Sequence, residues 1–152
     1  MIYFDHNATT PVDERVLQAM LPFFSKFYGN PSGLYKLARL SRSAIDTARE
    51  QVAQLVNARP EQVVFTSGGT EANNLALKGR GAKSKILISA FEHPSVIQSV
   101  DAHSVSVNEQ GYIDQQALSL IKGSFDLASF MLVNNETGVI QDVASLAAFM
   151  QQ

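Results

Sequence analysis

The second half of this 152-residue chain alternates short β-rich runs with segments of helical periodicity, and this alternation restricts the possible folds more than any other feature. The runs are bounded by residues that form turns, as strands usually are. They lie at residues 63–66, 86–88, 104–107 and 127–133. Strands that alternate with helices are typical of βαβ units, so the sequence predicts an α/β fold with a mostly parallel sheet and helices on both faces. In such a sheet, ligands bind at the carboxyl ends of the strands.

The N-terminal part of the chain lacks this alternation. We expect an extended arm over residues 1–12 and helices within residues 13–57, followed by βα units over residues 58–152. The last predicted helix begins at Val143 and meets no glycine, proline or other stop signal before Gln152. We therefore expect one partial domain over residues 1–152, with an incomplete sheet and a missing C-terminal remainder.

Composition excludes several classes of function. The formal net charge is −2, so there is no global basic field to hold nucleic acid or an anionic membrane. The chain has no cysteine, which excludes disulfides, a thiolate metal site and a cysteine nucleophile within it. It begins without a secretory signal pattern, and no apolar run approaches the roughly 18–20 residues of a membrane span. We expect a cytoplasmic protein.

The segment Ser67-Gly68-Gly69-Thr70 is the best candidate for a phosphate site, because it joins the predicted strand at 63–66 to a predicted helix at 70–78. Two glycines allow a ligand to approach the backbone closely, and the first N–H groups of a helix attract anions. An ordinary βα turn with hydroxyl capping explains the same residues. Segment 79–84 has neither the Gly-Lys-Ser/Thr of a Walker loop nor the third glycine of a dinucleotide fingerprint.

Two other polar segments follow predicted strands. His93 comes after the strand at 86–88, where an imidazole could stack on a planar cofactor or move protons. Asn134 and Asn135 come after the strand at 127–133, where an amide could donate to a phenolate or carboxylate oxygen. A loop histidine bonded to backbone and a simple turn are the alternatives. The sequence contains no His-Glu-x-x-His and no cysteine, so no metal site is predicted.

Five segments, in this order and spacing, resemble the cysteine desulfurases of the NifS/IscS type, which are class V, fold-type-I enzymes dependent on pyridoxal 5′-phosphate (PLP). The resemblance spans essentially the whole chain and implies a partial fold-type-I large domain. The segments are Phe4-Asp5-His6-Asn7-Ala8-Thr9-Thr10-Pro11, Gly29-Asn30-Pro31-Ser32, Val64-Phe65-Thr66-Ser67-Gly68-Gly69-Thr70-Glu71-Ala72-Asn73-Asn74, Glu92-His93, and Val133-Asn134-Asn135-Glu136-Thr137-Gly138-Val139-Ile140-Gln141-Asp142.

The resemblance implies a role for each matching residue. Gly69 and Thr70 resemble the turn that binds the PLP phosphate. His93 resembles the catalytic imidazole that stacks on the pyridine ring. Asn135 resembles the amide that contacts the cofactor's 3′-oxygen and the substrate carboxylate, and Asn30 lies near the substrate side. Family members are homodimers that take sulfur from L-cysteine, releasing L-alanine and leaving an enzyme persulfide for a sulfur-acceptor protein such as an iron–sulfur scaffold.

The sequence departs from the family in length, since it stops at less than half of the usual size. None of its six lysines stands in the Ser-x-His-Lys segment that supplies the Schiff-base lysine. The aspartate that pairs with the pyridine nitrogen, the nucleophilic cysteine and the carboxylate-binding arginine also belong to the missing part. Covalent catalysis needs an activated amine and sulfur transfer needs a thiolate, so we expect the 152-residue chain alone to be inactive.

Two alternatives stay open at this point. The chain could be a non-catalytic fragment that binds PLP weakly or docks on a full-length homologue. It could also belong to another class V enzyme, such as a selenocysteine lyase, an aminotransferase or a kynureninase-like enzyme. The five segments favour the desulfurase pattern by family analogy.

Overall fold

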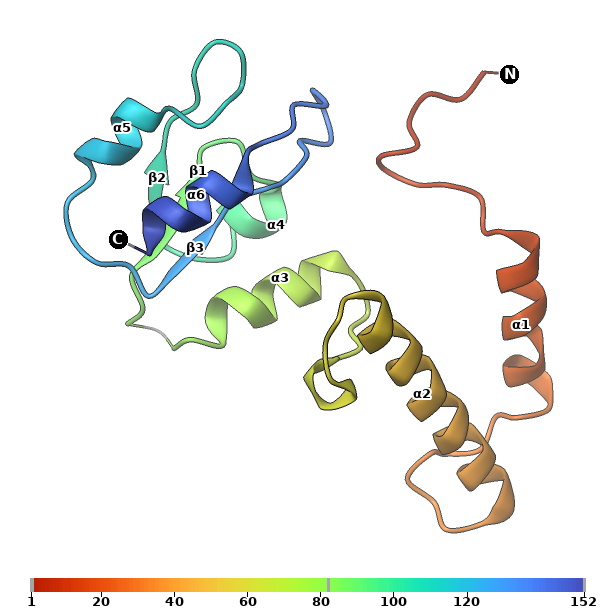
Figure 1. Ribbon diagram of the computed structural model, residues 1–152. Helices are drawn as coiled ribbons and strands as arrows, with labels where there is room; N and C mark the ends of the chain where they lie inside the picture. The colour runs from red at the N-terminus through yellow and green to blue at the C-terminus, as the bar shows by residue number, and fades with distance from the viewer. Residues whose placement is uncertain (1, 82, 152) are drawn as a thin grey trace. The chain divides into compact units, whose positions relative to one another are not determined.

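The computed structural model describes residues 2–81 and 83–151 (Figure 1). Their contacts divide the chain into two compact units, the first ending at Phe65 and the second beginning at Thr66.

The first unit contains two α-helices and a short 3₁₀-helix. Helix α1 (Glu14–Ser25) begins at Asp13, whose side chain accepts a hydrogen bond from the backbone N–H of Arg15. Helix α2 (Lys36–Leu55) and the 3₁₀-helix η1 (Pro60–Gln62) follow. Helices α1 and α2 lie within residues 13–57, where the sequence predicts helices, and η1 lies outside that range.

The loop between α1 and α2 packs directly against the backbone of α2. Gly29 is buried there, and a Cβ on it would lie 2.5 Å from the carbonyl carbon of Leu37. The hydroxyl of Ser41 on α2 donates to the carbonyl of Phe27 at 2.8 Å, which also holds the loop against α2. A glycine is therefore required at this close approach.

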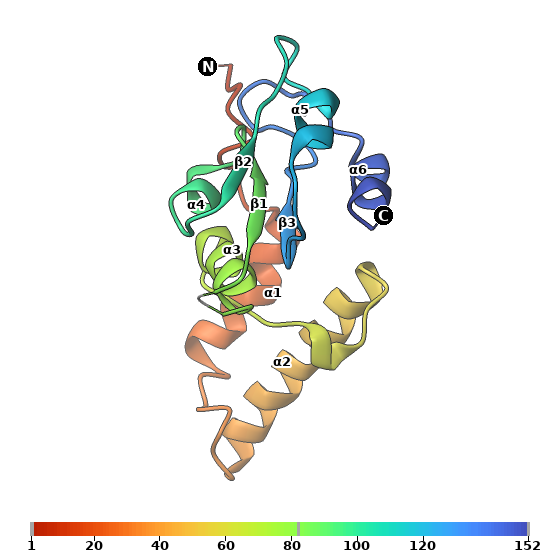
Figure 2. The same ribbon diagram turned by 90° about the vertical axis from the view of Figure 1, so that its left-hand side faces the viewer.

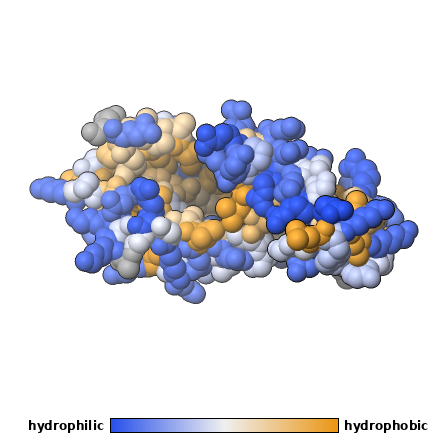
Figure 3. Space-filling model, turned by 90° about the horizontal axis from the view of Figure 1, so that it is seen from below, coloured by the Kyte–Doolittle hydropathy of each residue, from blue (hydrophilic) through white to orange (hydrophobic). Residues whose placement is uncertain are grey.

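Much of the apolar surface of the first unit is exposed. Helix α1 has no buried residue. Phe24 is 73% exposed and Phe4, on the N-terminal arm, is 91% exposed. Figure 3 shows such apolar residues, in orange, lying at the surface of the molecule.

The second unit is built on a parallel sheet with strand order β2-β1-β3. The central strand β1 (Ile86–Ser89) pairs with β2 (His103–Val105) on one side and β3 (Leu127–Ser129) on the other. All four residues of β1 are buried. A central strand that is buried on both faces explains why residues 86–88 are continuously apolar rather than alternating.

Helices cover both faces of this sheet (Figure 2). Helices α3 (Gly69–Lys78) and α4 (Pro94–Ile97) lie on one face, where Leu77 and Val96 pack with Ile86 and Ile88. Helices α5 (Gln115–Leu120) and α6 (Val143–Met150) lie on the other face, where Leu118 and Leu146 pack with Leu87. The predicted α/β class, with a mostly parallel sheet and helices on both faces, is confirmed.

Three predicted elements differ from the structure. Residues 63–66 are extended but are not a strand, because no neighbouring strand in the described residues pairs with them. The predicted strand at 104–107 is β2, which runs from His103 to Val105 and so ends two residues earlier than predicted. The predicted strand at 127–133 pairs with β1 only as far as Ser129. Local propensity determines whether a segment tends to form a strand, while the neighbouring strands determine how many of its residues pair.

Candidate functional site

The turn before α3 exposes backbone rather than side chains. Gly68 is the N-cap residue of α3, and a Cβ on Gly68 or Gly69 would meet nothing within 4 Å. Among the residues that the structure describes, no group accepts a hydrogen bond from the backbone N–H of Gly69, Thr70 or Glu71. Unpaired N–H groups at the start of a helix form a site for an anion.

Glu71 holds this turn in place without occupying its open face. Its carboxylate accepts hydrogen bonds from the backbone N–H of Ser67 at 2.7 Å and from the Ser67 hydroxyl at 2.6 Å. These bonds hold the pKa of Glu71 below its ordinary value, the hydroxyl having the larger effect. The carboxylate is thus bound back to the residue that precedes the glycines.

Thr70 and His93 line one cavity of about 370 Å³ in the second unit. The same cavity is lined by Lys78, which adds a positive charge. The remaining lining residues are Asn74, Pro94, Ser95, Gln98 and Ser99. An open glycine turn, a hydroxyl, a cation and an imidazole are groups that fit a phosphorylated aromatic ligand such as PLP.

His93 is the N-cap residue of α4, the short helix that follows β1. Its Nδ1 accepts a hydrogen bond from the backbone N–H of Ser95 at 3.1 Å, and the Ser95 hydroxyl lies 2.7 Å from the same nitrogen. The side-chain amide of Asn73 on α3 donates to that hydroxyl at 2.8 Å. His93 is therefore bonded to backbone, as one interpretation of the sequence expected. It also lines the cavity, and its role in stacking on a cofactor or in proton transfer stays a prediction.

Glu92 is buried directly beside His93 and joins the ends of two strands. Its Oε1 accepts from the Ser89 hydroxyl at 2.8 Å and from the backbone N–H of Met131, just after β3, at 2.7 Å. Burial raises the pKa of this carboxyl, although both hydrogen bonds act in the opposite direction. Glu92 thus fixes the segment that carries His93 to the strand that precedes the asparagine loop.

The two asparagines after β3 are placed differently. Asn134 is buried, and its Oδ1 accepts from the backbone N–H groups of Glu136 and Thr137, each at 2.9 Å. Its Nδ2 donates to the carbonyl of Phe91 at 3.1 Å, two residues before His93. Asn135 is exposed. Asn134 is therefore the turn-forming residue, and it holds the loop of Asn135 beside the loop of His93.

Asn30, the remaining candidate, belongs to the first unit. Its Oδ1 accepts from the backbone N–H of Ser32 at 3.1 Å, and its own N–H donates to the hydroxyl of Tyr35 at 3.0 Å. Its side chain is exposed and forms a local turn. Its proposed role near a substrate stays a prediction.

The sequence patterns give no prediction for Asn73, Lys78 or Ser95 as site residues. A signal existed for Lys78, because Thr70, Asn74 and Lys78 are spaced four residues apart and so share one face of a helix. Asn73 and Ser95 had no such signal, since their contact joins two helices that are distant in sequence.

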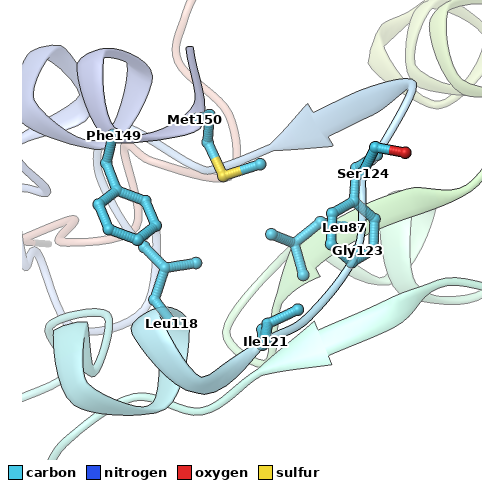
Figure 4. A pocket seen from close by; sticks show the side chains of 8 residues that line it. Leu87, Leu118, Ile121, Gly123, Ser124, Phe149 and Met150 are labelled. Carbon is cyan, nitrogen blue, oxygen red and sulfur yellow. The ribbon is translucent and has the colours of Figure 1, made fainter. Parts of the chain in front are cut away.

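A second cavity, of about 530 Å³, lies on the face of the sheet covered by α5 and α6 (Figure 4). Leu87, Leu118, Ile121, Phe149 and Met150 line it, and none of its lining side chains is titratable. It offers apolar contact but no group for acid–base or anion chemistry.

Comparison with known proteins gives the family. Residues 2–152 match the family described as aminotransferase class V. The chain belongs to the class V aminotransferase family. Cysteine desulfurase IscS from Dechloromonas aromatica is 40% identical over 167 residues, which cover 99% of this chain and 41% of that protein.

Solved structures give the same result for the fold of this class V chain. A NifS-like protein superposes with a TM-score of 0.89 at 32% identity, covering 99% of this chain and 45% of its own. SspA in complex with cysteine superposes with a TM-score of 0.87 at 33% identity, covering 98% and 48%. These relatives confirm the resemblance to NifS/IscS-type proteins and the fold-type-I class. The class V chain spans less than half of the length of each.

No helix in the described parts of this class V chain has the length and apolar composition to cross a membrane.

Proposed function

We propose that this chain is the cofactor-binding part of a PLP-dependent cysteine desulfurase, a partial large domain with an arm at 1–12, helices at 13–57 and βα units at 58–152. The observation that carries the proposal is the cavity shared by Thr70 and His93, next to a helix start with three unpaired N–H groups. The names of the relatives support the choice of reaction.

In this proposal the phosphate is bound at the start of α3 by the backbone of Gly69 and by the backbone and hydroxyl of Thr70. Lys78 adds attraction for a dianion, and the imidazole of His93 forms one wall for the pyridine ring. Asn135 contacts the 3′-oxygen and the carboxylate of the substrate, L-cysteine, with Asn30 on the substrate side. When bound, PLP supplies an electron sink for bond cleavage in an amino acid.

The partners belong to the proposal as well. A homodimer and a sulfur-acceptor protein such as an iron–sulfur scaffold follow from the family resemblance, as does a cytoplasmic location. A non-catalytic PLP-binding role remains the second candidate, because these 152 residues contain no cysteine and no Ser-x-His-Lys segment. The assigned residues bind, orient and hold protons, and no covalent step is assigned to them.

Cofactor binding is best tested with pyridoxamine 5′-phosphate, because its amine cannot condense with the six lysines of the chain. We expect saturable binding, followed by calorimetry. Thr70→Val removes one hydroxyl and should weaken binding about tenfold, which corresponds to about 1.4 kcal/mol. His93→Ala should weaken it by a similar factor through lost ring contact. Thr47→Val, an exposed threonine on α2, is the matched control and should leave affinity unchanged.

Pyridoxamine without the phosphate separates the two halves of the site. It should bind more weakly to the wild type and should not respond to Thr70→Val, while it should still respond to His93→Ala. Absence of saturable binding by the phosphorylated compound, or equal losses with Thr47→Val, contradicts the proposed function.

Catalysis by this chain alone should be absent. Incubated with PLP and L-cysteine, the chain should release no L-alanine above a protein-free control, since it lacks a thiol to accept sulfur. The measurement is alanine by amino-acid analysis over the time course of a full-length desulfurase. Alanine release that scales with the concentration of this chain contradicts the prediction.

A further inference from the structure

The imidazole of His93 has a hydrogen-bond environment that determines where its proton lies. The backbone N–H of Ser95 points at Nδ1 at 3.1 Å. A backbone N–H can only donate, so Nδ1 must offer a lone pair. The proton of the neutral ring is therefore on Nε2. Among the described residues, no group bonds Nε2.

The Ser95 hydroxyl, like the Ser95 backbone N–H, donates toward Nδ1 of His93. It lies 2.7 Å from Nδ1, and because that nitrogen offers a lone pair, the hydroxyl must donate its single proton to it. The hydroxyl can then only accept from its other partner. That partner is the side-chain NH₂ of Asn73, at 2.8 Å. Each group in the series donates to the next, from Asn73 to Ser95 to His93.

The series joins two elements, and its middle member is shielded from water while the ring of His93 is exposed. Asn73 lies on α3, the helix whose first turn carries the candidate phosphate site, while Ser95 and His93 lie at α4. Ser95 is only 9% exposed and Asn73 is partly buried. Hydrogen bonds away from water hold their geometry more strongly than exposed ones. If an acceptor replaces the Asn73 donor, we therefore expect the Ser95 hydroxyl to turn away from Nδ1.

We propose that Asn73 and the Ser95 hydroxyl are positioning residues that reinforce the backbone N–H of Ser95 and so favour the tautomer of the neutral His93 ring that has its proton on Nε2. This role rests on the proposed function. An imidazole that borders a cofactor can transfer a proton in a defined direction only if Nε2 either carries a proton or does not. The proposal assigns Nε2–H as a donor and disfavours Nδ1–H while the series is intact.

The test uses heteronuclear NMR of the imidazole nitrogens in the whole chain at neutral pH, without cofactor. The histidines are His6, His93 and His103, and His93→Gln assigns the signals. In the wild type we expect Nδ1 to be unprotonated. Asn73→Asp replaces the donor with an acceptor, so the hydroxyl turns to the carboxylate and the backbone N–H of Ser95 is left as the one donor to Nδ1 among the described residues. The share of molecules with a proton on Nδ1 should then rise roughly tenfold.

A double variant separates action through Ser95 from the effect of a nearby charge. Ser95→Ala removes the hydroxyl but keeps the backbone donor, so alone it should have a smaller effect than Asn73→Asp. If Asn73 acts through the hydroxyl, adding Asn73→Asp to Ser95→Ala should change the His93 signals little. If a new carboxylate acts simply by its charge, the increase persists in the double variant and the proposal is wrong.

Ser99→Ala is the matched control, because its hydroxyl donates to the carbonyl of Val96 and not to His93. It should leave the His93 signals unchanged. A wild-type ring with its proton on Nδ1 also overturns the proposal. Failure here is distinct from failure of the proposed function, since pyridoxamine 5′-phosphate binding is measured separately and the NMR experiment requires no cofactor.

Discussion

Asn134→Ala should lower the free energy of unfolding of the second unit by roughly 2–4 kcal/mol. The substitution removes the acceptor for the N–H groups of Glu136 and Thr137 and the donor to the carbonyl of Phe91. Because Asn134 is only 6% exposed, water cannot fully replace these bonds. Urea denaturation, with amide hydrogen exchange of β1 as the readout for this unit, measures the effect.

Asn108→Ala is a matched control for this prediction. The Asn108 side chain also accepts from two backbone N–H groups, those of Gln110 and Tyr112, but in an exposed turn where water can substitute. Its loss should stay below about 1 kcal/mol. Equal losses for the two variants would show that the burial of Asn134 does not matter. Asn134→Asp keeps the acceptor and loses only the bond to Phe91, so it should fall between wild type and Asn134→Ala.

The free energy of unfolding of Glu92→Gln should increase relative to that of the wild type as the pH rises. Burial raises the pKa of Glu92, so folding favours the protonated carboxyl. The stability that this group contributes is fully present below the ordinary pKa of a glutamate and is lost as the pH rises through the raised pKa. A glutamine remains neutral at every pH, and its Oε1 can still accept from Ser89 and Met131.

The difference in free energy of unfolding between Glu92→Gln and the wild type isolates the effect of Glu92. Other carboxyl groups change stability with pH in the opposite direction, and their effects cancel in this difference. The pKa values of Glu71 and Asp142 are lowered by hydrogen bonds from Ser67 and Ser145, so their contributions are lost as the pH falls. Urea unfolding of both proteins over a range of pH gives the difference directly. A difference that does not change with pH contradicts the assignment. Glu92→Ala should destabilise at all pH values, by roughly 2–4 kcal/mol, because two donors lose their acceptor.

The sequence is sufficient to predict those parts of the fold that depend on local patterns. The central strand at 86–88 and the start of the last helix at Val143 are found where the sequence predicts them. Elements that depend on partners are predicted less well. Residues 63–66 have strand composition but no strand beside them in the described structure, and residues 130–133 extend past the pairing with β1.

The candidate site also has features that the sequence predicts and features that it does not. Thr70 and His93 each follow a β-rich run in sequence, and they line the same cavity. The contact of Asn73 with Ser95 spans two helices and a strand, so no spacing rule reveals it. The separate roles of Asn134 and Asn135 are equally hidden in sequence, because the difference between them is burial rather than residue type.

The parallel order β2-β1-β3 also has a consequence for the route by which this chain folds. Leu87 pairs with His103, whereas Ile86 pairs with Leu127, so joining β1 to β2 closes a chain segment less than half as long as joining β1 to β3. The entropy lost on closing a loop grows with its length, and contacts distant in sequence form late. We therefore expect the segment of β1, α4 and β2 to form first. The docking of β3 then brings the asparagine loop to the His93 loop and completes the site last.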